Sequence, residues 1–152
     1  MAIKIIDLSA IYDLLYTKAS LAMAIFNPCR IKDGRCRRGD FCCQDCPHLG
    51  QNGCTVRALA CKLWLCRTAA RDPGNKVCQT ILQTIGEIAE YLNLNGYRHS
   101  KEQNLFPGET IIVNAEWMNQ CREKLRACDE WISFSHPGAI GDLFKDQRPA
   151  FL

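Results

Sequence analysis

Apolar residues recur at intervals of three and four positions near the start of the chain. The stripe between residues 8 and 26 consists of Leu8, Ile11, Leu15, Ala19, Ala22 and Phe26. This spacing puts the apolar side chains on one face and predicts an amphipathic helix. Either Asp7 or Ser9 can accept a hydrogen bond from the amides of its first turn. Pro28 cannot continue a helix and restricts Asn27 before it, so we expect the helix to end there.

Two further helices are predicted in the middle of the chain. Residues 55–70 are helix-forming and apolar on most sides, which indicates a largely buried helix. Residues 72–74 read Asp-Pro-Gly, which is typical of a turn. A long helix is expected after this turn, over residues 75–93, and its apolar stripe consists of Val77, Ile81, Ile85, Ile88 and Leu92.

The last third of the chain predicts a short strand and one more helix. Residues 93–108 are polar and rich in turn-forming residues, and the β-branched run at 110–113 predicts a strand. Asn114 is suited to cap a helix that runs to about residue 131. The tail, residues 133–152, contains two prolines and two glycines. We expect it to be irregular, with one helical turn.

The segment between the first two predicted helices has no helical period. Residues 27–55 contain four of the ten glycines and two of the six prolines. A connection of this length is either functional or disordered, and its cysteines favour the functional interpretation. We therefore predict a mainly α fold, a single small helical domain over residues 1–152. We expect a cysteine-rich metal-binding loop between its first and second helices.

The chain contains 11 cysteines among 152 residues, and their role depends on the compartment. The N-terminus has no long apolar stretch followed by a small-residue cleavage site, so no signal peptide is expected. The longest apolar run covers six residues, 21–26, whereas a transmembrane helix needs about twenty. We therefore expect a soluble cytoplasmic protein, whose reduced thiols bind metal or take part in redox chemistry.

Most of the cysteines are concentrated in one segment. Cys29 precedes a group of seven that fall within 31 residues: Cys36, Cys42, Cys43, Cys46, Cys54, Cys61 and Cys66. Structural zinc takes four thiolate or imidazole ligands, and iron–sulfur clusters take four cysteines in most cases. Where two residues separate a pair, as between Cys43 and Cys46, a tight turn can present both sulfurs to one centre. The turn-forming run from Gly50 to Gly53 comes directly before Cys54. Residues 29–66 are therefore the predicted metal-binding segment.

The second predicted helix limits which cysteines can share a centre. On one regular helix, Cys61 and Cys66 would be about 7.5 Å apart along the axis and about 140° apart around it, too far to bind one ion. Either the helix begins near Cys61 and directs its positive N-terminus at an anionic centre, or Cys66 belongs to the core. We prefer the first alternative. Adjacent Cys42 and Cys43 are expected to point to different sides, so one is a ligand and the other packs nearby.

The middle of this segment resembles a known family. Residues 42–56 read Cys-Cys-Gln-Asp-Cys-Pro-His-Leu-Gly-Gln-Asn-Gly-Cys-Thr-Val, and Cys61 and Cys66 follow. This run resembles the CxxCxxCC family of zinc- or iron-chelating domains, whose members carry a double cysteine, then Cys-x-x-Leu, then Gly-Cys-x-Ile/Val and a further cysteine. The resemblance covers residues 36–66, a fifth of the chain, and the spacing from Cys36 to Cys42 is wider than in the family. It implies a chelated metal, often taken to be an iron–sulfur cluster, and no defined activity.

These observations lead to a hypothesis of one metal centre. Its ligands are expected to be Cys43, Cys46, Cys54 and Cys61, and three further cysteines are candidates for a larger or second centre: Cys36, Cys42 and Cys66. Because the chain has a single Cys-x2-Cys pair, where a zinc ribbon would have two, an iron–sulfur cluster is favoured over zinc. Such a cluster would transfer electrons or sense redox state. The alternative is a structural zinc interaction module that contacts nucleic acid or a protein partner.

Other roles for the cysteines remain open. Disulfides are one alternative, although an odd number of cysteines excludes complete pairing within the chain, and unbound thiols are another. Cys121 and Cys128 are seven residues apart on the last predicted helix, about 10.5 Å, which exceeds the roughly 7 Å limit for a disulfide. These two, together with Cys78, are expected in the core.

Charge and motifs exclude several functions. The 19 lysines and arginines exceed the 16 aspartates and glutamates by three, too few to indicate binding to nucleic acid or to a membrane. We expect His48 to be a loop histidine rather than a ligand. No known catalytic motif is present, so no reaction is assigned. A cluster of basic residues is expected to offset an anionic centre or to be solvated, which disfavours nucleic-acid contact: Arg30, Lys32, Arg35, Arg37 and Arg38.

Overall fold

The computed structural model describes residues 2–33, 36–37, 49–50, 53–54, 57–94, 98–99 and 108–135. Its elements in chain order are β1 (Ile3–Asp7), α1 (Leu8–Phe26), β2 (Leu49–Gly50), β3 (Gly53–Cys54), β4 (Arg57–Ala58), α2 (Leu59–Leu63), α3 (Arg67–Arg71), the 3-10 turn η1 (Pro73–Asn75), α4 (Lys76–Tyr91), β5 (Arg98–His99), β6 (Thr110–Asn114) and α5 (Ala115–Ser135). The described part of the chain is mainly helical, which confirms the mainly α part of the predicted fold class.

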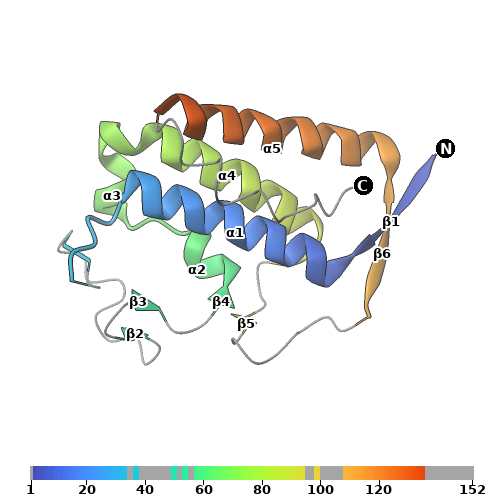
Figure 1. Cartoon of the computed structure of the whole chain (residues 1–152), viewed down its shortest axis with the longest axis horizontal. Coiled ribbons are helices and arrows are strands. Elements are labelled where there is room, and N and C mark those ends of the chain that lie inside the picture. Colours follow the sequence, from blue (N-terminus) through green and yellow to red (C-terminus); the bar gives the residue numbers. More distant parts are fainter. Residues whose placement is uncertain are drawn as a thin grey trace.

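The long helices α1, α4 and α5 form the body of the described part of the molecule (Figure 1). Helix α4 contacts both α1 and α5, and the short α2 packs against α1 and α4. The apolar stripes meet in one core, as their spacing predicts, although Val77 of the α4 stripe is exposed. The largest fully buried side chains include Ile11, Tyr12, Leu15, Leu59, Ile81, Leu82, Ile85, Leu94, Met118 and Ile132.

Side-chain caps mark the starts of α1 and α5, and a backbone hydrogen bond closes the end of α1. Asp7 caps α1, since its Oδ1 accepts a hydrogen bond from the N–H of Ala10 at 3.0 Å. This distinguishes Asp7 from Ser9, the other predicted cap. Helix α1 ends at Asn27, which adopts a left-handed backbone with φ 43° and donates its N–H to Met23. Oδ1 of Asn114 accepts from two amides at the start of α5, which confirms the predicted cap.

A two-stranded ribbon precedes the first and last helices. β1 and β6 pair antiparallel, with Ile5 opposite Ile112, and each strand runs directly into its helix. The strand at 110–113 was predicted and extends by one residue, whereas β1 was not predicted. Its alternation is broken by Ile5 and Ile6, and its partner lies over a hundred residues away in the sequence. The outer face of the ribbon exposes Ile3, Ile5 and Ile112.

The predicted single helix over residues 55–70 is wrong. The chain instead forms α2 and α3, separated by an extended break at residues 64–66. Leu63 and Leu65 explain the break, because they would point about 160° apart on a continuous helix. Both pack against the core. Breaking the helix between them lets both side chains reach it.

The remaining boundaries agree with the sequence to within a few residues. Helix α4 begins at Lys76 and ends at Tyr91, and α5 continues to Ser135, beyond the predicted end near residue 131. The predicted tail from 136 onward and most of the cysteine-rich loop lie outside the described residues. None of the helices in the described part combines the length and the hydropathy needed to cross a bilayer.

Candidate metal centre

The β2–β3 pair carries the first candidate ligand, Cys54. Leu49 pairs with Cys54 and Gly50 with Gly53, so the chain reverses where the glycines predicted a turn. Residues opposite each other on antiparallel strands have Cα atoms about 5 Å apart. The hairpin thus places Cys54 opposite Leu49, which follows the predicted ligand Cys46 by three residues in the sequence.

Cys61 lies on α2 with its side chain exposed. The start of α2 is held by α1, because the N–H of the buried Leu59 donates to the hydroxyl oxygen of Tyr12 at 2.9 Å. The helix thus begins close to Cys61, as the preferred alternative expected. With five residues it aligns few peptide dipoles, so its attraction for an anionic centre is small.

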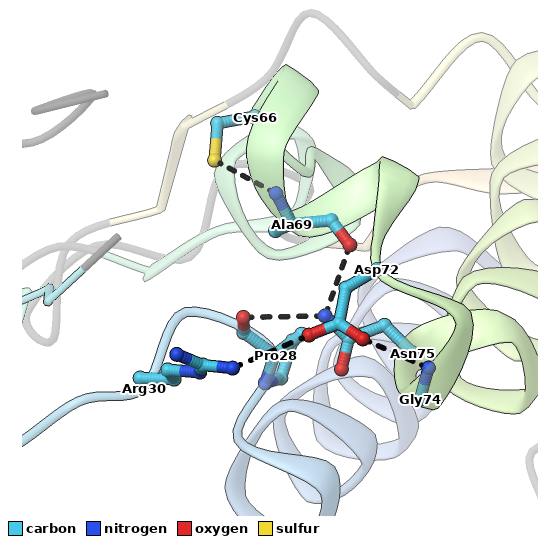
Figure 2. A network of polar contacts seen from close by, with 7 residues as sticks. All are labelled: Pro28, Arg30, Cys66, Ala69, Asp72, Gly74 and Asn75. Carbon is cyan, nitrogen blue, oxygen red and sulfur yellow. Dashed lines mark hydrogen bonds and ion pairs between the residues drawn. The ribbon is translucent and has the colours of Figure 1, made fainter. Parts of the chain in front are cut away.

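Cys66 lies at the break between α2 and α3 and is buried. It caps α3, since its Sγ accepts a hydrogen bond from the N–H of Ala69 at 3.4 Å (Figure 2). The sequence offered two alternatives, a helix that begins near Cys61 or a core position for Cys66. Both hold, because the helix is interrupted between the two cysteines.

Asn75 anchors the chain that follows α1, a role that sequence reasoning missed. Its side-chain N–H₂ donates to the carbonyl oxygens of Pro28, at 3.3 Å, and Ala69, at 2.9 Å (Figure 2). Asn75 is buried, although it was expected only as the start of a helix. The carbonyl oxygen of buried Cys29 accepts a hydrogen bond from the N–H of Arg37 at 3.2 Å. The partly buried Cys36 directly precedes Arg37 in the chain, so it lies close to this contact with Cys29.

The basic residues after α1 have acidic neighbours. Arg30 forms an ion pair with Asp72 at 3.6 Å, and Arg37 forms one with Asp33 at 3.5 Å (Arg30 and Asp72 in Figure 2). Such exposed pairs contribute at most about 1 kcal/mol. They agree with a solvated basic loop. Lys32 is exposed, and Arg35 and Arg38 lie outside the described residues.

The three cysteines assigned to the core are buried there, as predicted. Burial, together with a smaller effect of the neighbouring Cys29, raises the pKa of the Cys78 thiol to about 12. Burial likewise raises the pKa values of Cys121 and Cys128 to about 11. Because the thiolate is the metal ligand and the nucleophile, these cysteines are poorly suited to either role.

The described residues contain no group of three or more Cys, His, Asp or Glu side chains arranged to hold a metal ion. Four of the residues singled out in the cysteine-rich segment lie outside the described part: Cys42, Cys43, Cys46 and His48. Among the four preferred ligands, Cys61 is the one whose side-chain exposure is described. Whether a metal suits this segment is therefore judged from the chemistry of its donor atoms. Several cysteine thiolates are suited to zinc or to an iron–sulfur cluster.

Comparisons of the chain with protein-family models, with curated proteins and with solved structures found no match. The family resemblance of residues 36–66 therefore stays a prediction.

The contrast between Cys61 and the core cysteines predicts their reactivity. In protein treated with a chelator and a reductant at pH 8, iodoacetamide is expected to modify Cys61 at least about 100-fold faster than Cys78, because a thiol with a raised pKa is scarcely ionised. Time-resolved peptide mass spectrometry measures both rates. In urea the two rates should converge. Equal rates in the folded protein would contradict the burial of Cys78.

Proposed function

We propose that this protein binds one metal centre through thiolates of its cysteine-rich segment, with Cys43, Cys46, Cys54 and Cys61 as ligands. The centre is an iron–sulfur cluster or a zinc ion. The observation that carries the proposal is the separation of the cysteines by environment. Cys61 of the cysteine-rich segment is exposed, whereas Cys78, Cys121 and Cys128, which lie outside the segment, are buried in the helical core.

The local chain path supports a role for Cys54 and Cys61 together. Cys54 ends the β2–β3 hairpin, and β4 and α2 follow within five residues. The hydrogen bond from Leu59 to Tyr12 attaches this path to α1. The ligands nearest the helical body are thus supported by its core, and metal binding would fasten the remaining segment onto it. Part of the folding free energy would then come from the metal.

The other candidates have different surroundings. Cys36 is partly buried near the anchored chain at Cys29, and Cys66 is buried as the cap of α3. Either could serve a larger or second centre together with Cys42. A ligand at Cys66 would keep its N–H···S bond, since a metal-bound thiolate still accepts hydrogen bonds.

The metal determines what the protein does. An iron–sulfur cluster supplies an electron-transfer or redox-sensing centre when bound, and zinc held by four cysteines is structural. In the alternative function, zinc stabilises a module that contacts a protein or nucleic acid. The ion pairs of Arg30 and Arg37 weaken the nucleic-acid version, because both cations already have carboxylate neighbours. A reducing compartment, the cytoplasm, belongs to the proposal because free thiols must persist.

Metal analysis of protein purified without oxygen tests the proposal. Iron with acid-labile sulfide and a brown colour would identify a cluster, and stoichiometric zinc in colourless protein would identify a zinc site. Protein that carries neither metal, with free or disulfide-bonded thiols, would overturn it. In the zinc case, a salt-sensitive shift with RNA would favour the interaction module.

A further inference from the structure

An open groove runs between α2 and α4. Its volume is about 610 Å³, and it is shallow and open to solvent on most of its surface. Ala60, Leu63 and Trp64 line one side, and Gly86, Glu87 and Glu90 line the other. All of these lining residues belong to the described part of the chain.

The apolar part of the groove is unusually exposed. Trp64 follows the last residue of α2 and has 56% of its surface accessible, although indole is a side chain that proteins usually bury in part. Leu63 beside it is half-buried against the core. Gly86 contributes no side chain to the opposite wall, and a Cβ there would lie 3.9 Å from Leu63 Cδ1, so the glycine lets α2 pack closely against α4. The groove therefore offers a flat aromatic surface for an apolar side chain.

The other side of the groove is negatively charged. Glu87 and Glu90 are three residues apart at the C-terminal end of α4, where they repel each other and lie near the negative end of the helix dipole. Lys124 of α5 lies 3.8 Å from Glu87. Within the described part of the chain, no cation is paired with Glu90. This placement is unfavourable for the helix itself, and a local conflict of this kind is expected at functional sites.

We propose that this groove binds a basic peptide segment of a partner protein, with an apolar side chain against Trp64 and flanking lysine or arginine side chains at Glu87 and Glu90. The charge of the groove selects the partner, because an acidic segment or nucleic acid would be repelled. The chain as a whole carries a net charge of +3, so the attraction is local to the groove. This proposal does not depend on the metal centre.

A labelled hexapeptide, Lys-Arg-Leu-Leu-Arg-Lys, is a suitable probe for fluorescence anisotropy with the full chain. We expect saturable binding with a Kd below about 1 mM at low salt. Two control peptides, one with glutamate in place of the basic residues and one with serine in place of leucine, should bind at least about tenfold more weakly. Comparable binding of all three peptides, or no binding, would overturn the proposal.

Three variants locate the binding. The double substitution Glu87→Gln and Glu90→Gln should raise the Kd at least about tenfold, and Trp64→Ala at least about fivefold. The matched control is Glu123→Gln with Glu130→Gln, which removes two exposed charges from α5 and should leave the Kd within about twofold. Circular dichroism checks that each variant is folded. Equal affinity in the groove and control variants would contradict the assignment. So would a dimer of the free protein that the Glu87 and Glu90 substitutions disperse, because a second copy would then occupy the groove.

Discussion

Replacing Asp129 with asparagine is expected to destabilise the folded chain by about 3 kcal/mol. Both carboxylate oxygens of Asp129 on α5 lie 2.7 Å from Nζ of Lys18 on α1. The Lys18 side chain is only 8% exposed, so its ammonium group is largely removed from water and the carboxylate offsets the cost of burying its charge. The amide of asparagine would remove this negative charge from beside the buried cation. Urea unfolding followed by circular dichroism measures the loss.

Two further variants distinguish the cost of burying a charge from the cost of losing an ion-pair contact. Replacing both residues, Lys18→Met with Asp129→Leu, should recover stability to within about 1 kcal/mol of the original, because no buried charge remains. Glu123→Gln removes a carboxylate from the exposed ion pair with Arg126 and should cost less than about 0.5 kcal/mol. If Asp129→Asn were as mild as Glu123→Gln, Lys18 would not be a buried, paired cation.

Replacing Cys54 or Cys61 with alanine is expected to lower the bound metal by at least about half in each case, because a centre with four ligands loses one. Both variants should also lose stability when the metal is lost, since binding contributes to folding. Metal per chain, measured by elemental analysis on protein purified without oxygen, gives the result.

The matched control is Cys121→Ala. Cys121 is buried on α5, so its removal creates a small cavity but should leave the metal content unchanged. Equal retention of metal in all three variants would show that Cys54 and Cys61 are not ligands. Metal loss from Cys121→Ala as well would mean that the assay reports unfolding rather than ligation.

The helices could be predicted because their signals are local. The apolar stripe and caps of α1 lie within the helix and its two neighbouring residues, and its predicted bounds are the observed ones. The break at residues 64–66 could not be predicted in this way. It depends on where Leu63 and Leu65 meet the core, which no local period records. β1 was missed for a similar reason, since it exists by pairing with β6 at the far end of the chain.

The candidate site was predictable in part. From the spacing of the cysteines along the chain, Cys78, Cys121 and Cys128 were assigned to the core rather than to the cysteine-rich segment, and all three are buried. The Gly50–Gly53 turn was likewise visible in the sequence. The roles of Asn75 and Tyr12 were not, because a polar group that joins distant segments gives no periodic signal. Their hydrogen bonds with Pro28, Ala69 and Leu59 follow only from the packing of α1 against its neighbours.

X-ray absorption at the edge of the bound metal tests the central claim most directly, because it reports the atoms around the metal. The account predicts a first shell of about four sulfur atoms, near 2.3 Å if the metal is zinc. Iron in a cluster would likewise be surrounded by sulfur. A first shell of oxygen and nitrogen atoms, or fewer than three sulfurs, would contradict a centre held by the cysteine-rich segment.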